Sequence, residues 1–513
     1  MSETSVDNKR IAKNTLLLYF RMLFMMAISL YTSRVVLVTL GISDYGIYNV
    51  VGGFVTLFTM VSGTMATATQ RFLSFEIGKG TQEKITNLFS TSVMIHIILC
   101  CIILLLAETI GLWFVNCKMV FPPERITAVN WVFQFSIFSL IINVLSVPYN
   151  ASIIAYEKMG AFAYIGILEA LLKLLVVYLI KLSTIDKLVV YAFLLMLIAV
   201  GIRIIYTLYV KKHFQFCRCN WKLDKEYRQS LLSFISFNFI GSIAHISKTQ
   251  GINIILNLFF GTVVNAARGI SVQILNAVSG FVTNFQLALN PQIIKQYASG
   301  EKEAMLRLIF RGSKYSYLLL LLISFPIIVE TPYILHLWLV DVPEHTCIFV
   351  RLTLIISLID SLSNTLIVGV HATGQVKKYQ LINGSMLMMT LPIVYVVLII
   401  TNIPYMAFVV SLCISIICYI IRICILSNLI SFPVIFYLKS VTLRIIIVSL
   451  MSSLVPVFLL LKGGDGFLCF FINCVVTILS VIFCEFFLGL DNSEKHMLKK
   501  IISNRLTLNS KKK

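Results

Sequence analysis

The feature that most constrains this chain is a series of apolar runs, each long enough to cross a bilayer, that recurs from one end to the other. A helix of about 20 apolar residues spans the hydrocarbon core of a membrane. Fourteen such runs can be marked, at about 11–40, 45–70, 85–115, 127–155, 160–180, 188–210, 229–257, 264–290, 315–338, 348–373, 381–400, 404–426, 445–461 and 467–488. The sequence therefore predicts an all-α polytopic membrane protein with about 14 transmembrane helices.

The composition supports this prediction. The chain is 58% hydrophobic and only 12% charged, whereas soluble domains carry about 25% charged residues. Its twelve cysteines lie mostly within apolar runs, so we expect them to be small buried hydrophobes. Cys217 and Cys219 lie on a basic loop without a second cysteine pair. No metal site and no cofactor is therefore expected.

The distribution of Lys and Arg predicts an orientation. With a cytoplasmic N-terminus, 29 Lys and Arg lie on the cytoplasmic side outside the spans and 5 on the opposite side. This is the bias that the positive-inside rule describes. Both termini are therefore predicted to be cytoplasmic, and the first apolar run to be an uncleaved helix. The net charge of +20 then reflects topology, and no nucleic-acid partner is expected.

The loops leave no room for a soluble domain. None on the outer side exceeds about a dozen residues, and the longest inner loop spans roughly 211–228. No G-x-x-x-x-G-K-[ST], H-E-x-x-H or G-x-S-x-G motif occurs, so neither ATP hydrolysis nor a recognisable hydrolase site is encoded. The chain is predicted not to be an enzyme, and its function is expected to lie within the helices.

The two halves of the chain resemble each other at an offset of 220 residues. Gly41 in "LGISDYGIYN" aligns with Gly261 in "FGTVVNAARG". At the same offset Gly80 falls on Gly300 and Glu83 on Glu303. An even number of helices in each half gives both halves one orientation, so a pseudo-two-fold axis would run along the membrane normal. The alternative is a chance alignment of apolar sequence.

This repeat predicts the domain organisation. Its parts are an N-terminal bundle of six helices at 1–210, a cytoplasmic linker at 211–228, a second six-helix bundle at 229–426, two appended helices at 427–490 and a basic cytoplasmic tail at 491–513. A cavity is expected between the two bundles.

The stretch "RIAKNTLLLYFRMLFMMAISLYTSRVVLVTLGISDYGIYNVVGGFV", together with "ATQRFLSFEIGKG", resembles the start of bacterial polysaccharide-biosynthesis flippases, which export O-antigen and capsule repeat units. This family belongs to the superfamily that includes multidrug and toxin extrusion transporters. The resemblance covers the whole chain in helix count and repeat layout, and is sharpest over about 10–80 and 257–300. It implies a V-shaped, two-bundle fold in the bacterial cytoplasmic membrane. It also implies, as substrate, an undecaprenyl-pyrophosphate-linked oligosaccharide that is flipped to the periplasmic leaflet.

Five residues are predicted to line the cavity and to bind a pyrophosphate: Arg21, Arg34, Lys248, Arg268 and His245. The four basic residues lie in the predicted helices at 11–40, 229–257 and 264–290, and none has an acidic residue three or four positions away. Arg offers bidentate geometry to phosphate oxygens, and Lys a point charge. His245 shares a helix face with Lys248. The alternatives are pairing with carboxylates on other helices and, for His245, a hydrogen bond between helices.

Three further charged residues suggest an ion pair or a coupling site. Lys173 follows Glu169 by four residues, the spacing of an intrahelical ion pair, and a proton- or cation-linked site is the alternative. Asp360, in the middle of a span, is either the partner of a basic residue or a coupling site. Three other basic residues fall near helix ends, where long side chains are expected to reach the interface: Arg203, Arg351 and Arg422.

The favoured prediction is a flippase that translocates a polyprenyl-pyrophosphate-linked oligosaccharide by alternating access for surface polysaccharide assembly. Its candidate partners are the bilayer, H⁺ or Na⁺, and other polysaccharide-assembly membrane proteins. A multidrug–cation antiporter of the same fold would need acidic residues in its cavity, and the first, second, seventh and eighth predicted helices contain four basic residues and no acid. An oligosaccharide polymerase typically works with a large periplasmic loop, and every outer loop here is short.

Overall fold

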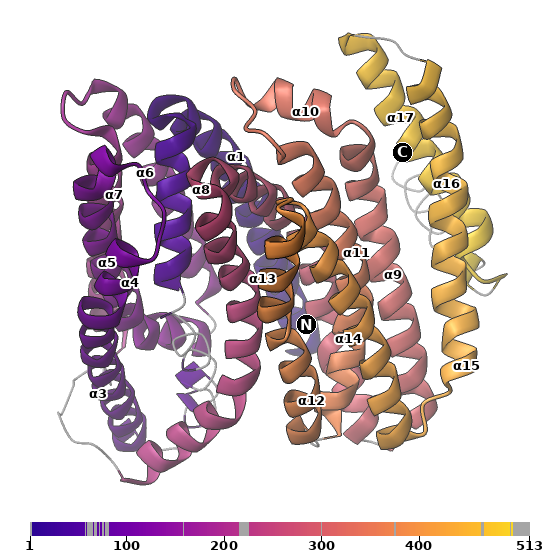
Figure 1. Cartoon of the computed structure of the whole chain (residues 1–513). Helices are drawn as coiled ribbons and strands as arrows, with labels where there is room; N and C mark the ends of the chain where they lie inside the picture. The colour runs from indigo at the N-terminus through magenta and orange to yellow at the C-terminus, as the bar shows by residue number, and fades with distance from the viewer. Residues whose placement is uncertain are drawn as a thin grey trace, which may run out of the picture. The chain divides into compact units, whose positions relative to one another are not determined.

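The computed structural model describes residues 3–56, 58, 65, 69–70, 72–73, 76, 82–156, 158–214, 225–298, 300–373, 376–462, 466–492 and 494–495. Within these ranges it does not describe the side chains of 3–22, 159, 225–226, 229–246, 284, 287–288, 291–292, 295, 298, 376–377 and 460–462. Every regular element in the described part of the chain is a helix (Figure 1). The predicted all-α class is confirmed.

Long helices make up most of the described chain (Figure 1). They are α1 (Glu3–Thr56), α3 (Gln82–Leu106), α5 (Ile126–Ala155), α6 (Met159–Leu182), α7 (Lys187–His213), α8 (Lys225–Ala298), α9 (Lys302–Val329), α11 (Thr346–Ala372), α12 (Val376–Met388), α13 (Thr390–Thr401), α14 (Met406–Ile430), α16 (Leu443–Lys462) and α17 (Phe467–Cys484). Shorter helical pieces extend or link them: η2 (Ala107–Gly111), α4 (Leu112–Cys117), η3 (Pro123–Arg125), α10 (Thr331–Trp338), α15 (Val434–Tyr437), η4 (Leu438–Thr442) and η5 (Glu485–Gly489).

The number of spans agrees with the sequence. Among the described residues, 12 helices are long and apolar enough to cross a membrane. Two of them, in α1 and α8, each join two predicted helices across a bend. These 12 helices therefore correspond to the fourteen predicted spans.

A glycine forms each bend. Gly41 in α1 has φ 80° and ψ 168°, and Gly261 in α8 has φ 73° and ψ −162°. This region of backbone space is open to glycine because it has no Cβ, and essentially closed to other residues. Helix resumes directly after Gly41, so the break between the first two predicted spans is a single residue. One positive-φ residue is enough to redirect the chain.

The 220-residue repeat is present in the structure. Helices α3 and α9 begin at Gln82 and Lys302, and α5 and α11 begin at Ile126 and Thr346, so each pair is offset by 220 residues. The bends at Gly41 and Gly261 have the same offset. Gly300 also has a positive φ, of 79°, while its predicted counterpart Gly80 lies outside the described residues.

Substituting either bend glycine is expected to destabilise the protein. A Cβ at Gly41 or Gly261 would meet no atom within 4 Å, so the effect of Gly41→Ala or Gly261→Ala comes from the backbone alone, about 1–3 kcal/mol. Gly52→Ala is the matched control, because Gly52 lies in the same helix, has open space and lacks a positive φ. Thermal unfolding of the purified protein measures the difference. Equal melting temperatures for Gly41→Ala and Gly52→Ala would contradict this account.

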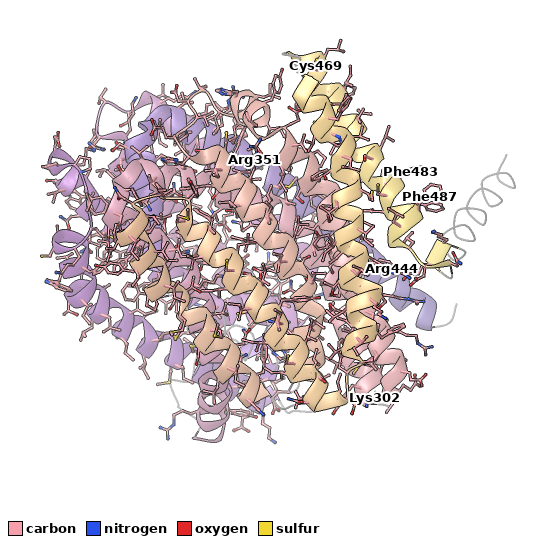
Figure 2. The ribbon with its side chains drawn as sticks, turned by 45° about the vertical axis from the view of Figure 1, so that its right-hand side comes forward. Lys302, Arg351, Arg444, Cys469, Phe483 and Phe487 are labelled. Carbon is pink, nitrogen blue, oxygen red and sulfur yellow. The ribbon has the colours of Figure 1, made fainter. Side chains whose placement is uncertain are left out.

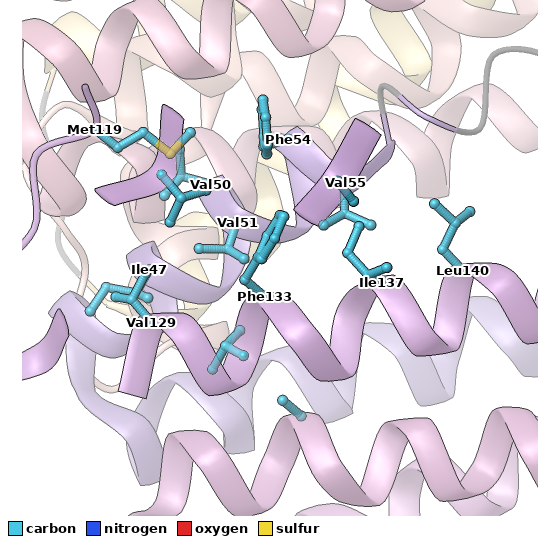
Figure 3. Packing of buried hydrophobic residues seen from close by; sticks show 14 of the residues in the cluster. Ile47, Val50, Val51, Phe54, Val55, Met119, Val129, Phe133, Ile137 and Leu140 are labelled. Atoms are coloured by element: carbon cyan, nitrogen blue, oxygen red, sulfur yellow. The ribbon is translucent and has the colours of Figure 1, made fainter. Parts of the chain in front are cut away.

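The described chain divides into two compact units. The first unit comprises 1–273, 338–346 and 380–410, and the second comprises 274–337, 347–379 and 411–513. The predicted six-plus-six division of the sequence remains a prediction. In the first unit, apolar side chains of α1 beyond the bend pack against α5, with Ile47, Val51 and Phe54 facing Val129 and Phe133 (Figure 3).

In the second unit, α9 packs against the C-terminal helices α16 and α17. Asn473 Nδ2 on α17 donates a 2.8 Å hydrogen bond to Glu330 Oε1, directly after α9. Near the other end, Lys314 Nζ on α9 lies 2.7 Å from Glu494 Oε2, beyond η5. The helices α16 and α17, with η5, form the C-terminal hairpin. Figure 2 shows Phe483 and Phe487 on the outer side of this hairpin, where both are exposed. The last hairpin is therefore held to α9 near both ends.

Candidate substrate site

All five predicted cavity residues lie on α1 and α8, within the first unit. The side chains of Arg21 and His245 are outside the described residues, so their predicted roles stay predictions. Arg34 and Lys248 are half-buried, and Arg268 is 9% exposed. Of the three side chains that the structure describes, that of Arg268 alone is buried to the degree at which an unpaired charge becomes costly.

Two hydrogen bonds fix the register of α1 against α8. Gln273 Nε2 donates to Ser29 Oγ at 2.6 Å, and the hydroxyls of Ser43 and Thr262 are 3.3 Å apart. From the first contact to the second, residue numbers rise along α1 and fall along α8, so the two segments are antiparallel. The second contact lies beside both bends, which brings Gly41 and Gly261 to the same level.

This register places two of the predicted residues at one depth. Arg34 lies five residues beyond Ser29, and Arg268 lies five residues before Gln273. At 1.5 Å per residue, each is about 7–8 Å from the Ser29–Gln273 contact, measured toward the bends. The two guanidinium-bearing positions therefore occupy the same level of the helix pair, as a site for one anionic group requires.

Arg268 has a polar and an aromatic neighbour. Its Nη2 donates a 3.0 Å hydrogen bond to the Thr249 carbonyl, and its Cζ lies 5.3 Å from the centre of the Phe408 ring. Among the described residues, no carboxylate lies within ion-pair distance of Arg268 or Arg34. A buried guanidinium without a carboxylate partner is costly unless other groups hold it.

Buried asparagines beside Arg268 were not singled out from the sequence. Asn265 Nδ2 donates to the carbonyl of Asn253 at 2.7 Å and to its Oδ1 at 2.8 Å, and Asn253 Nδ2 donates to the Asn49 carbonyl at 3.2 Å. These bonds tie both arms of α8 to α1. The sequence contains asparagines at 253, 257 and 265 in "NIILNLFFGTVVNAARG". This pattern could have indicated them, because an asparagine inside a membrane span needs a hydrogen-bond partner.

Glycines allow the close approach that these bonds need. A Cβ at Gly46 would lie 1.9 Å from the Thr262 carbonyl oxygen, and one at Gly269 would lie 2.6 Å from Asn49 Cγ. Both glycines are in regular helix, so they are required for space rather than for backbone conformation. The packing of α1 on α8 is therefore tight at the level of the bends.

The other predicted charges behave differently. Lys173 Nζ donates to Glu169 Oε1 at 2.6 Å, as an i,i+4 pair whose side chains are 44% and 31% exposed. This is the intrahelical pair that the spacing favours. Asp360 on α11 is half-buried and has no ion pair among the described residues. A role for it in coupling remains a prediction. The described residues contain no cluster of three or more His, Cys, Asp or Glu that could hold a metal.

Each of the three basic residues that are expected to reach the interface contacts protein groups, and their position relative to a bilayer stays a prediction. Arg203 stacks on Tyr149, with Cζ 3.9 Å from the ring centre. Arg422 is 7% exposed and its Nε donates to the Tyr379 hydroxyl at 3.2 Å. Arg351 Nε donates to the Ile328 carbonyl at 3.0 Å, at the last turn of α9. Each of these side chains thus has a protein partner.

A charged cluster in the first unit joins three segments and was not foreseen. Arg125, between α4 and α5, donates from Nη2 to Asp44 Oδ2 at 2.6 Å and from Nη1 to Asp186 Oδ2 at 2.5 Å. Asp186 also caps α7, accepting from the amides of Leu188 and Val189. Asp44 follows the Gly41 bend by one turn, so the cluster ties the bend to the ends of α5 and α7.

The pKa of Asp186 reflects this contact. Burial raises the pKa, but the hydrogen bonds from Arg125 and from the amides of α7, with the Arg125 charge, lower it by more. The pKa of Asp186 therefore lies below its usual range. The ion pair stabilises the fold above the unfolded pKa of about 3.9, and this contribution is lost as the pH falls through the folded value.

This predicts a pH-dependent effect of Asp186→Asn. The stability gap between the natural protein and Asp186→Asn should be full at about pH 6 and should narrow below about pH 4. Asp341→Asn is the control, since Asp341 is exposed and has no ion pair among the described residues. Thermal unfolding across this pH range checks the prediction. A gap of the same size at both ends of the range would contradict it.

Comparisons with known proteins identify the fold. No model of a known protein family matches the chain, and no curated protein matches it. The structure is similar to that of the lipid II flippase MurJ in an inward closed conformation, with a TM-score of 0.68 and 13% identity over 92% of this chain and 98% of that one. It is also similar to an inward-facing multidrug resistance MATE family transporter of the MOP superfamily, with a TM-score of 0.61 and 13% identity over 80% and 96% of the two chains.

A third similar structure is a MOP superfamily transporter from Pyrococcus furiosus, whose title reports a binding pocket of reverse polarity. Its TM-score is 0.56, with 12% identity over 81% of this chain and 96% of that one. These likenesses agree with the superfamily that the sequence resemblance indicated. The chain has the fold shared by the lipid II flippase MurJ and the MATE transporters of the MOP superfamily.

Proposed function

We propose that this protein is a flippase that moves a polyprenyl-pyrophosphate-linked oligosaccharide across the bacterial cytoplasmic membrane for surface polysaccharide assembly. The observation that carries the proposal is Arg268. It is buried in a membrane-spanning helix and has no carboxylate partner among the described residues. The fold, which this chain has in common with a lipid II flippase, supports transport of a lipid-linked anion.

A pyrophosphate fits the chemistry of these residues. Its oxygens accept the paired N–H groups of a guanidinium in bidentate fashion. Arg34 lies at the level of Arg268, and Lys248 lies on the other arm of α8. In a setting with little water, such fixed positive charge replaces the hydration that the pyrophosphate gives up. The glycan would occupy a hydrated cleft, and the polyprenyl chain would stay in lipid.

The proposal includes a topology and a transport cycle. Both termini face the cytoplasm, and the two six-helix repeats at 1–210 and 229–426 rock against each other so that the cavity opens alternately to each side. The bends at Gly41 and Gly261 are suitable pivots, because each concentrates a change of direction in one residue. H⁺ or Na⁺ is the candidate coupling ion, with Asp360 as a candidate site.

A multidrug–cation antiporter is the main rival, and the charges disfavour it. A cavity for cations needs free carboxylates. Asp44, directly after the Gly41 bend of α1, is engaged by Arg125 at 2.6 Å. Glu169 is engaged by Lys173. The third candidate, an oligosaccharide polymerase, is disfavoured by the short loops between the predicted spans on the outer side.

Deleting the gene in its host and restoring it on a plasmid tests the function. We expect the deletion to abolish surface polysaccharide and to leave polyprenyl-pyrophosphate oligosaccharide in the membrane, accessible only from the cytoplasmic side. The restored full-length chain should reverse both effects. Normal surface polysaccharide in the deletion strain, together with greater sensitivity to cationic drugs, would instead identify the antiporter.

A further inference from the structure

One exposed side of η2, α4 and α5 carries four polar side chains among apolar ones. Glu108 lies in η2 and accepts a 3.0 Å hydrogen bond from Gln134 Nε2 of α5. Asn116 of α4 and Asn130 of α5 exchange reciprocal hydrogen bonds of 2.9 Å. All three bonds are exposed. These four residues are called the acceptor face below.

The surroundings of the acceptor face are apolar and exposed. Leu105 is 64% exposed and Ile110 60%, and Trp113 and Trp131 are 54% and 53% exposed. Both helical stretches are long and apolar enough to span a membrane. Such an outer surface faces hydrocarbon or a neighbouring protein. A carboxylate on it is costly unless it is paired.

Within the acceptor face, the depth of the Glu108–Gln134 pair sets it apart from the aqueous ends of the helices. Lys118 and Arg125 lie in the connection between α4 and α5 and mark the water side. Trp113, with Lys118 Nζ 5.7 Å above its ring, and Trp131 sit where interfacial tryptophans are expected. Gln134 follows Arg125 by nine residues, about 13 Å along the axis. The polar boundary of a bilayer is about 5–7 Å thick on each side, so the Glu108–Gln134 pair lies beneath it.

The geometry of η2 brings Glu108 to this surface. Residues Ala107–Gly111 form a π-helical turn between α3 and α4. A π turn inserts one residue into an α-helix and rotates the residues that follow, and such turns occur frequently at functional sites. Ala107 and Gly111 are buried while Glu108, Thr109 and Ile110 are exposed. The irregular turn therefore presents a carboxylate outward rather than burying it.

The hydrogen bonds that these four residues already make indicate which chemical groups could bind to the acceptor face. Asn116 Nδ2 donates to Leu112 O and to Asn130, and Asn130 Nδ2 donates to Ile126 O and to Asn116. Both amides have thus used their two N–H groups. In the described part of the chain, no hydrogen bond uses Glu108 Oε1 or Gln134 Oε1. The face offers oxygen acceptors and almost no donors.

We propose that the acceptor face is the docking surface for a transmembrane helix of another protein, one that presents a Lys, an Arg or an amide donor a few residues inside its outer end. Donors from such a helix would satisfy the carboxylate and the amide oxygens, as polar contacts between membrane helices do. A second copy of this chain that packed through the same face would supply mainly acceptors rather than donors.

A crosslinking experiment with designed peptides tests this proposal. The full-length protein, with a photoreactive amino acid at Ile110, is placed in phosphatidylcholine vesicles with a Trp-flanked Leu/Ala transmembrane peptide. The peptide carries either one Lys or one Leu, five residues inside its outer end. We expect about three- to ten-fold more crosslinking to the Lys peptide. Glu108→Leu should abolish the preference and Glu108→Gln should reduce it. Thr109→Val should keep it, because Thr109 Oγ1 donates within its own helix, to Leu105 O.

Each other outcome contradicts the proposal. Equal capture of the two peptides, or a preference that survives Glu108→Leu, would remove the acceptor face as a docking surface. Loss of the preference when phosphatidylethanolamine replaces phosphatidylcholine would assign the surface to lipid ammonium groups. A crosslinked dimer of the protein that depends on Glu108 would assign it to a second copy. Equal thermal stability of the variants shows that a lost preference is not a loss of fold.

Discussion

Replacing Arg268 by alanine is expected to reduce transport about 10- to 100-fold, the loss that follows when charge-assisted hydrogen bonds of about 1.5–3 kcal/mol are removed. Arg268 is buried in α8, at the level of Arg34 on α1. Arg268→Lys keeps the charge without the bidentate geometry, so it should retain an intermediate rate. Surface polysaccharide in a deletion strain that carries each variant gives the measurement.

Arg307→Ala is the matched control for Arg268→Ala. Arg307 is an exposed basic residue on α9, so its replacement removes one positive charge without touching the proposed site, and transport should be unchanged. Protein levels in the membrane must be equal for the comparison. Full activity of Arg268→Ala, at equal protein level, would exclude Arg268 from anion binding.

The largest expected effect on stability belongs to the ion pair that holds the C-terminal hairpin. Lys314 and Glu494 have side chains that are each 3% exposed, with Nζ and Oε2 2.7 Å apart. Removing one partner of a buried pair leaves an uncompensated charge and costs about 3–5 kcal/mol. We therefore expect Lys314→Ala and Glu494→Ala each to lower the melting temperature of the purified protein strongly.

The pair belongs to a small network, which supplies the controls. Asp491 contacts Arg444 of α16 and Lys314, and Arg311 lies 3.8 Å from Glu494. Figure 2 labels Arg444 on α16. Arg311 has a side chain that is 44% exposed, so Arg311→Ala should have an effect of about 0–1 kcal/mol. The double variant Lys314→Met/Glu494→Leu should be much less damaging than either single change, because no charge is left unpaired. Additive losses in the double variant would contradict a buried ion pair.

The fold was predictable from the sequence because its causes are local or periodic. Apolar runs of bilayer length predict helices wherever they occur, and glycine at both Gly41 and Gly261 marks positions that need a backbone other residues avoid. The 220-residue offset then relates the two halves. What the sequence could not predict was that the Gly41 break would be a single residue. Beside this break, Ser43 contacts Thr262, which lies 219 residues away in the sequence.

The candidate site was only partly predictable, because the role of a charged residue in a membrane protein depends on which residues it contacts. Lys173 contacts Glu169, which lies one helical turn away, so the sequence spacing was enough to predict this ion pair. Arg125 finds Asp44 and Asp186, which are 81 and 61 residues away in the sequence, and no local pattern predicts that. Arg203 stacks on Tyr149 of another helix, and no local pattern predicts this contact either. Long-range packing decides these cases.

A flipping measurement with purified protein in vesicles shows directly whether fixed basic residues on α1 and α8 carry a pyrophosphate-linked lipid across the membrane. The substrate is a fluorescent polyprenyl-pyrophosphate sugar, and the comparison lipid carries the same sugar on a polyprenyl chain without phosphate. We expect the natural protein to flip only the pyrophosphate lipid, and Arg268→Ala to slow this flipping about 10-fold or more. Equal flipping of both lipids, or an unchanged rate in Arg268→Ala, would contradict this expectation.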